Sequence, residues 1–198
     1  KSKSPSCGLA RVPVYSGADR NKARHGTGLF AKAYMETFPL VPIEDEGRLN
    51  DAKLRENFIV RVFSFNRLNK LLGKDFSKGA LVKFHTRHKF LLLAHSRKHY
   101  ALLGQMVANA KSLKLAEIKA LYSASFMEAL SYKSTPKKNT DVLLHMTGFL
   151  KMFLTKKEKE SILTVIEDYH KELLSLIVPV TLMRHQAKKY DIKYLFSF

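Results

Sequence analysis

Cysteine is nearly absent from this sequence of 198 residues, which contains only Cys7. A single cysteine cannot form a disulfide within the chain, so the class of disulfide-stapled secreted domains is excluded. The sequence also lacks an apolar run long enough for a membrane-spanning helix, and its start lacks the charged, apolar and small-residue layout of a secretory signal. We therefore expect a soluble, globular protein of the cytoplasm.

Familiar catalytic motifs are missing as well. The sequence contains no GxGxxG, P-loop or HExxH pattern and no Ser, His and Asp order of a hydrolase, and the GTG at residues 26–28 is too short to hold a phosphate. Glu44 and Glu46 lie in a proline-flanked linker, where we interpret them as solvated charges. No catalytic centre is predicted from residue 28 onward.

Acidic residues are scarce relative to basic ones. The chain has 35 Lys and Arg against 17 Asp and Glu, which gives a formal net charge of +18. Between Asp75 and Glu117 there is no acid at all, although lysines and arginines recur throughout that segment. A polarised charge of this size predicts a polyanionic partner, with nucleic acid as the leading class. The alternative is a generally basic composition that serves solubility.

Hydrophobic periodicity predicts a mainly α fold, in which a helical bundle domain follows a short α/β remnant of a truncated N-terminal domain. Residues 1–27 are rich in Gly, Pro and Ser, and RVPVY is the only predicted strand. Helical spacing occurs at residues 27–38, 50–72, 77–110 (with a break near 94–96), 114–132, 139–153, 155–175 and 179–190. The acidic segment 41–51 is the predicted seam between domains at residues 1–48 and 49–198.

Three local features add detail to these helices. Thr155 and Glu158 have the spacing of a capping box, and Pro179 suits the first position of the last helix. Gly104, inside a helical pattern, indicates a close helix crossing. The aromatic residues Tyr122, Phe126 and Tyr132 have helical spacing and are predicted to be core.

Half of the histidines lie in FHTRHKFLLLAHSRKHY, residues 84–100. On one helix, His85, His88, His95 and His99 would share a stripe, and three interpretations remain open. A metal site would use His95 and His99, but the sequence nearby offers no third ligand. Alternatively, a half-buried stripe would hydrogen-bond within the bundle. The remaining interpretation is a nucleic-acid face with rings for stacking and cations for phosphates. It gives the predicted RNA-binding residues Lys83, Arg87, His88, Lys89, His95, Arg97, Lys98, His99 and Tyr100.

Two parts of the chain resemble known families. KSKSPSCG resembles the last cysteine motif of the thiouracil desulfidase family, and GTGLFAKAYMETFPLVPIEDEGRLND resembles the segment that closes that domain. The later motifs RVFSFNRLNKLL, LVKFHTRHKFLLLAHSRKHYALLG and LIVPVTLMRH are similar to the YbgA-like helical domain. Together the two resemblances describe a DUF523–DUF1722 arrangement.

This resemblance implies a specific chemistry. In the desulfidase family three cysteines hold a [4Fe–4S] cluster with one open iron, which suits a sulfur donor. The thiocarbonyl sulfur binds that iron, water attacks the ring carbon, and sulfide leaves without net redox. Cys7 matches one of the three ligands, and Ser4 and Ser6 are candidate neighbours that would hydrogen-bond around it. The fused members imply action on 4-thiouridine in transfer RNA, with the helical domain gripping the RNA.

The carry-over from the family is incomplete, because the pattern needs two more cysteines upstream of Cys7. We therefore expect either a fragment of a longer protein or one half of a split protein. The intact parent is expected to be a non-redox [4Fe–4S] desulfidase, whereas this chain alone is expected neither to hold a complete cluster nor to catalyse desulfidation. An alternative of a different class is a stand-alone helical nucleic-acid-binding or interaction module with no enzymatic role.

Overall fold

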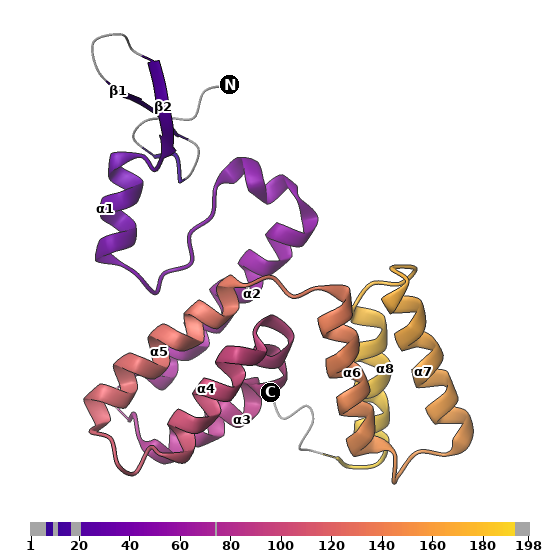
Figure 1. The fold of residues 1–198 in the computed structure, drawn as a ribbon. Coiled ribbons are helices and arrows are strands. Elements are labelled where there is room, and N and C mark those ends of the chain that lie inside the picture. Colours follow the sequence, from indigo (N-terminus) through magenta and orange to yellow (C-terminus); the bar gives the residue numbers. More distant parts are fainter. Residues whose placement is uncertain (1–6, 10–11, 17–20, 74, 193–198) are drawn as a thin grey trace. The chain divides into compact units, whose positions relative to one another are not determined.

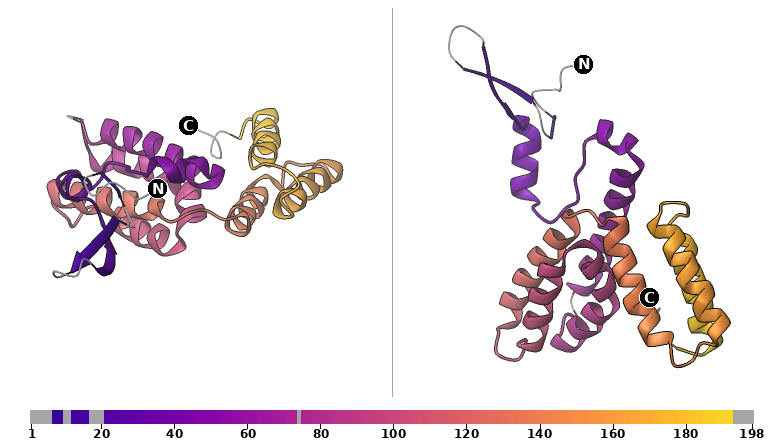
Figure 2. Two further views of the ribbon diagram at one scale, coloured as in Figure 1. Left: turned by 90° about the horizontal axis from the view of Figure 1, so that it is seen from above. Right: turned by 45° about the vertical axis from the view of Figure 1, so that its right-hand side comes forward.

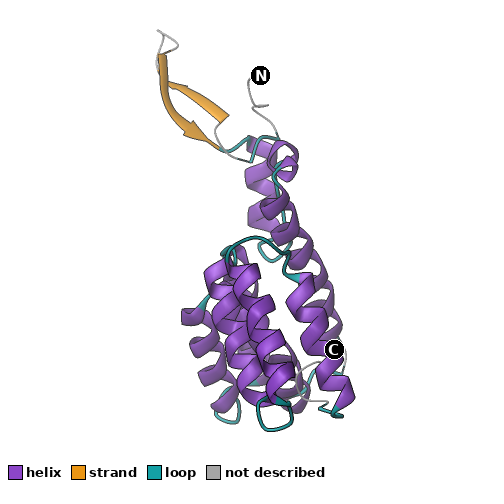
Figure 3. Ribbon diagram, turned by 90° about the vertical axis from the view of Figure 1, so that its right-hand side faces the viewer, coloured by secondary structure: helices purple, strands orange, loops and turns teal. Residues whose placement is uncertain are grey.

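The computed structural model describes residues 7–9, 12–16, 21–73 and 75–192. Helices make up almost all of the regular structure in these residues, and the strands are confined to one hairpin (Figure 3). The predicted mainly α fold is therefore confirmed. The elements labelled in Figure 1 are β1 (Val12–Ser16), β2 (Asn21–Gly26), α1 (Leu29–Thr37), the short 3-10 helix η1 (Glu46–Asn50), α2 (Ala52–Leu71), α3 (Lys78–His95), α4 (Arg97–Ala108), α5 (Leu115–Ser131), α6 (Pro136–Leu150), α7 (Lys156–His170) and α8 (Ile177–Lys189).

The chain divides into two compact units, Lys1–Lys70 and Leu71–Phe198. In the first unit β1 and β2 form an antiparallel hairpin whose register shifts between Val14 and Tyr15. The polar sequence NKARHG of β2 carries no strand signal of its own, so its pairing with β1 is what makes it a strand. The interpretation of this region as the remnant of an α/β domain, and its boundary at residue 48, stay predictions.

Polar side chains fix where several helices begin. Ser77, Ser96, Thr135 and Thr155 each accept a backbone N–H in the first turn of α3, α4, α6 and α7. At α7 the Glu158 carboxylate also accepts the Thr155 backbone N–H at 2.8 Å, which confirms the predicted capping box.

The last helix begins earlier than the sequence indicates. The prediction that Pro179 opens it is wrong, because α8 starts at Ile177 and Pro179 is its third residue. Proline is tolerated there since the N–H groups of a first helical turn have no acceptor within the helix.

The second unit contains two groups of three helices (Figure 2). Helices α3, α4 and α5 pack against one another, and so do α6, α7 and α8; α3 also packs on α6. Tyr122 and Phe126 of α5 are almost fully buried, as predicted, but Tyr132 is 49% exposed. Tyr132 follows the last residue of α5 as its C-cap, so it has left the inward face of that helix.

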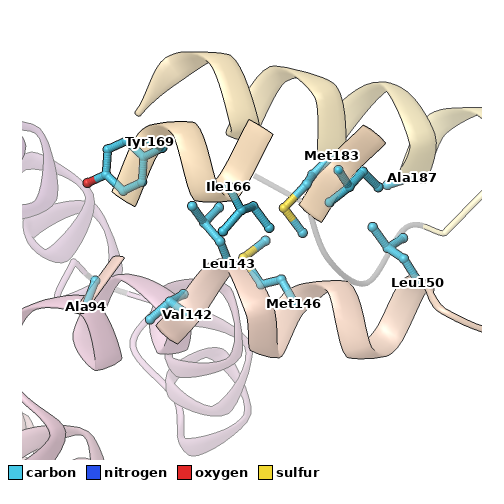
Figure 4. Packing of buried hydrophobic residues seen from close by; sticks show 10 residues of the cluster. Ala94, Val142, Leu143, Met146, Leu150, Ile166, Tyr169, Met183 and Ala187 are labelled. Carbon is cyan, nitrogen blue, oxygen red and sulfur yellow. The ribbon is translucent and has the colours of Figure 1, made fainter. Parts of the chain in front are cut away.

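The core of the second helical group is lined by aliphatic and methionine side chains that converge from α6, α7 and α8 (Figure 4). Leu150, Ile162, Ile166 and Met183 are at most 2% exposed, and Ala94 extends the same cluster onto α3. This shared core fixes the position of α6 against α3. It therefore brings together residues that are about fifty positions apart in the sequence, a separation that periodicity alone does not bridge.

Gly104 does not mark a forced contact. A Cβ added there would lie 3.9 Å from His85 Nε2, an ordinary van der Waals distance, so the predicted close crossing is not what the structure requires. No helix within the described part of the chain is both long and apolar enough to cross a bilayer.

Candidate nucleic-acid interface

Exposed cations lie along α3 and at the start of α4. Lys83 and Arg87 are exposed one helical turn apart on α3, and Arg97 and Lys98 are exposed in the first turn of α4. All four belong to the stretch between Asp75 and Glu117 that contains no acid. We refer to these four residues as the cationic row. Exposed Lys and Arg without neighbouring acids along the chain are suited to contacts with phosphates.

The predicted stripe of histidines is divided between two helices. Ser96 ends α3 through its backbone N–H, which donates to Leu92, and its hydroxyl caps α4. His85, His88 and His95 therefore lie on α3, and His99 lies on α4. The predicted break near residues 94–96 is confirmed, and the prediction of one continuous stripe of four imidazoles is wrong.

Three of the four histidines are buried inside the bundle. His88, His95 and His99 are 5%, 3% and 4% exposed. Nδ1 of His88 lies 2.8 Å from the Phe84 carbonyl, and Nδ1 of His99 lies 2.8 Å from the Ser96 hydroxyl. These contacts match the interpretation in which the histidines hydrogen-bond within a helical bundle. In this conformation the three rings are not open to a large ligand.

His95 links three segments of the chain. Its Nδ1–H donates to the Tyr132 carbonyl at 2.6 Å, since a carbonyl can only accept. The Lys138 ammonium donates to the His95 carbonyl at 2.9 Å and to the Lys133 carbonyl at 3.2 Å. Burial and the nearby Lys138 charge lower the pKa of His95, while its bond to Tyr132 acts in the opposite direction. The ring is thus held neutral where α3, the α5–α6 loop and α6 meet.

His85 and Tyr100 lie on the faces of α3 and α4 that approach each other. Nδ1 of His85 is 3.1 Å from the Tyr122 hydroxyl, and the rings of His85 and Tyr100 are nearly parallel with centroids 6.5 Å apart. Burial raises the pKa of Tyr122, and burial followed by the neighbouring His88 and Lys89 lowers that of His85. Both groups are therefore neutral near pH 7, and Tyr100 is half-buried beside them.

Lys89 lies over an aromatic cluster that the spacing of residues in the sequence does not predict. Phe90 of α3 meets His145 and Phe149 of α6 with ring centroids 6.0 and 6.1 Å away. The Lys89 ammonium lies 4.6 Å from the Phe90 centroid and 5.4 Å from that of Phe149. We call Phe90, His145 and Phe149 the α3–α6 aromatic cluster. The spacing of His145 and Phe149 places them on one face of α6, but only the packing of α6 on α3 brings them to Phe90.

Cys7 is exposed at the start of the described chain. The segment after it is tied to the start of α1, because Gly28 N–H donates to the Gly8 carbonyl at 2.7 Å and the Thr27 hydroxyl donates to the Leu9 carbonyl at 3.1 Å. Ser4 and Ser6 lie outside the described residues. Among the residues that are described, no group of three or more His, Cys, Asp or Glu side chains could hold a metal ion.

Comparison with protein families gives one extended and one weaker match, and comparison with individual proteins gives a relative of the helical part. Residues 89–197 match the family described as protein of unknown function DUF1722, and residues 1–46 match 2-thiouracil desulfurase more weakly. The uncharacterized protein YbgA of Escherichia coli (strain K12) is 26% identical over 148 residues, which cover 74% of this chain and 88% of that protein. No solved structure matches. The similarity to YbgA supports the resemblance seen in the helical motifs.

Proposed function

The chain belongs to the family described as protein of unknown function DUF1722, and from that starting point we propose that its helical region binds RNA. The observation that carries the proposal is the cationic row of Lys83, Arg87, Arg97 and Lys98, exposed on α3 and α4 within a segment free of acids. Lysine and arginine contacts to phosphates displace condensed counterions and supply most of the sequence-independent affinity for nucleic acids.

The buried histidines have a different role in this proposal. His95 ties α3 to the α5–α6 loop through its hydrogen bond to the Tyr132 carbonyl, whereas His88 and His99 bond locally, to Phe84 within α3 and to Ser96 at the start of α4. They position the cationic row and do not contact RNA themselves. The RNA contacts are assigned to the exposed cations.

We further propose that the chain is the C-terminal part of an iron–sulfur-dependent desulfidase acting on 4-thiouridine in transfer RNA. The match of residues 1–46 to 2-thiouracil desulfurase and the position of Cys7 within it support this. Iron–sulfur clusters are held by several cysteine thiolates, whereas this chain supplies one. A [4Fe–4S] cluster therefore does not fit these residues by themselves, and its other ligands would be cysteines that the 198 residues do not contain.

The single thiol also favours a second candidate, an RNA-binding or interaction module without enzymatic activity. The two candidates differ in what precedes Cys7 in the gene. Two further cysteines about a domain's length upstream, and sulfide release from thiolated transfer RNA by the extended and anaerobically reconstituted protein, are expected for the desulfidase. An open reading frame without such cysteines would leave the binding module.

RNA binding itself is tested by removing charge at two different places in the helical unit. We expect transfer RNA affinity to fall steeply with salt, and Arg87→Ala, Arg97→Ala and Lys98→Ala together to lower the slope of log K against log salt by about 2 to 3. The matched control replaces Lys156, Lys157 and Lys159 with Ala, which removes the same charge from exposed positions of α7. Gel shifts or fluorescence anisotropy over a salt series measure both. An equal loss in the two triple variants would mean that the charge acts without a defined face.

A further inference from the structure

We propose that the surface around Tyr132 binds an unpaired nucleotide of RNA, with its base on the Tyr132 ring and its phosphates beside cations; this inference rests on the proposed RNA binding and adds a contact that is not electrostatic. The surface consists of Tyr132 and Lys133 of the α5–α6 connection, Lys137 of α6, and Arg97 and Lys98 of α4. All five residues are exposed, although they come from segments that are distant in the sequence. We call them the Tyr132 surface.

Hydrogen bonds at His95 hold these segments together. The His95 Nδ1–H donates to the Tyr132 carbonyl at 2.6 Å, and the Lys138 ammonium donates to the His95 carbonyl at 2.9 Å and to the Lys133 carbonyl at 3.2 Å. Because the first turn of α4 follows His95 closely in the chain, the same bonds place the α5–α6 connection beside that turn. The Lys138 ammonium is used in these bonds and is not assigned to RNA.

The Tyr132 ring lies against the first turn of α4. Its centroid is 5.4 Å from that of the His99 ring, with 37° between the two ring planes. His99 is 4% exposed whereas Tyr132 is 49% exposed, so the tyrosine covers the histidine and still presents surface to solvent. The bond to His95 uses the backbone carbonyl of Tyr132 and therefore does not depend on the ring. Aromatic rings stack on single-stranded bases of any identity.

Four exposed cations accompany this ring. Arg97 and Lys98 lie in the first turn of α4, Lys137 lies in the first turn of α6, and Lys133 precedes α6 in the connection. The first turns of both helices contain no acid. The dipole of a helix disfavours cations at its N-terminal end, so the stability of the two helices does not account for these residues. Phosphates beside the stacked base would neutralise them.

Glu128 and Asp141 are the acids nearest to the Tyr132 surface along the chain. The Glu128 carboxylate lies 3.4 Å from Nε2 of His99, so it is turned toward that ring. Asp141 lies one turn further along α6 than Lys137. Because the four exposed cations outnumber these two carboxylates, the surface favours a polyanion over a basic or an apolar protein segment.

The first test separates the ring from the hydroxyl and from charge. Tyr132→Leu removes the ring, Tyr132→Phe keeps it, and both leave the backbone carbonyl that binds His95 in place. Tyr34→Leu is the matched control, because Tyr34 is a tyrosine of α1 that is 38% exposed. The probes are a fluorescein-labelled oligouridine of about ten nucleotides and an RNA duplex of the same length.

We expect Y132L to weaken binding of the single strand by about 5- to 100-fold, with the salt slope unchanged. Duplex binding by Y132L is expected to match the wild type, because the bases of a duplex are not free to stack on a side chain. Y132F and Y34L are expected to match the wild type with both probes.

The second test concerns the two lysines that the Tyr132 surface adds to the cationic row. We expect Lys133→Ala and Lys137→Ala together to lower the slope of log K against log salt by about 1 to 2. The matched control replaces Lys156 and Lys157 with Ala, which removes the same charge from exposed positions of α7 and should keep the wild-type slope. Equal slopes in the two double variants would overturn the assignment of Lys133 and Lys137 to phosphates.

The third test uses the unmodified protein and does not depend on any variant folding. Oligouridine carrying 5-iodouridine is crosslinked by ultraviolet light, and tryptic fragments are sequenced by mass spectrometry. The fragment of residues 120–133 contains Tyr132 and the 1% exposed Tyr122, and the fragment of residues 99–111 contains the half-buried Tyr100. We expect the crosslink at Tyr132.

The outcomes distinguish the Tyr132 surface from RNA binding in general. If the wild type binds neither probe, the proposed function fails and the Tyr132 surface fails with it. If the wild type binds oligouridine but Y132L, shown to be folded by circular dichroism, binds equally well, the stacking contact alone is wrong. Equal losses in Y132L and Y132F would assign the contact to the hydroxyl and would also overturn stacking. A crosslink confined to residues 99–111 would overturn it as well and move the contact to Tyr100.

Discussion

The buried, neutral His95 predicts that the helical unit loses stability in mild acid. The ring is 3% exposed, and its Nδ1–H donates to the Tyr132 carbonyl. Burial and Lys138 lower its pKa from the ordinary 6.5. Below pH 6.5 the unfolded chain binds a proton at His95, whereas the folded chain binds that proton only at a lower pH. Because the unfolded state then holds more protons, stability falls as the pH falls.

The size of the effect has an upper limit. At about pH 5 the unfolded histidine lies 1.5 units below its ordinary pKa of 6.5, and each unit corresponds to about 1.4 kcal/mol. His95 therefore removes up to about 2 kcal/mol of the free energy of unfolding between about pH 7 and about pH 5. Glu158 does not contribute in this window, because hydrogen bonds from Lys189 and Thr155 lower its pKa to about 2.

The assay is urea denaturation followed by circular dichroism across this pH range. His95→Asn keeps a side-chain N–H for Tyr132 but does not titrate, so we expect lower stability at every pH and a pH slope smaller than that of the wild type. His85, whose pKa burial also lowers, titrates equally in both proteins and cancels in the comparison. His185→Asn, at an exposed position of α8, is the control and should keep the wild-type slope. Equal losses between about pH 7 and about pH 5 in wild type and H95N would refute the reasoning.

Two further predictions concern α6. Leu150 is 0% exposed and lies in the same core as Ile162, Ile166 and Met183. Leu150→Ala should therefore lower the free energy of unfolding, measured by urea denaturation, by about 3 to 5 kcal/mol. A loss below about 1 kcal/mol would mean that the core closes around the smaller side chain. A Cβ added at Gly148 would meet no atom within 4 Å. Gly148→Ala should therefore raise the free energy of unfolding by roughly 0.5 to 1 kcal/mol, which would be seen as a higher melting temperature. An unchanged or lower melting temperature would contradict this prediction.

The sequence predicts the elements of this fold better than their neighbours. Helical periodicity and the Thr155 and Glu158 capping box are local signals, and the structure confirms both. β2 cannot be predicted from local signals, because its polar residues become a strand only through pairing with β1. Pro179 is the third residue of α8 and not the first, as predicted, because a proline is accepted at several positions of the first turn, where the N–H groups have no acceptor within the helix.

The candidate site shows a sharper limit. His88 and Arg87 are adjacent in a basic stretch, and their residue types alone do not tell which of them faces the bundle. The structure buries His88 and exposes Arg87, because α4 and α5 cover one side of α3. The contact between Phe149 and Phe90 could not be predicted from the sequence, because it depends on how α6 packs on α3. The predicted RNA contacts of the exposed cations remain a prediction.

The corner at Ser96 limits how the length of this domain can vary. Ser96 both ends α3 and begins α4: its backbone N–H donates to the Leu92 carbonyl, and its hydroxyl oxygen accepts the His99 backbone N–H. A single inserted residue at this corner would turn α4 by about 100° about its axis and carry His99 and Leu103 out of the core. In the α6–α7 connection these two roles belong to different residues, because Lys151 ends α6 and Thr155 caps α7, and Met152 between them is 82% exposed. Insertions, tags or spectroscopic labels are therefore better placed near Met152 than at Ser96.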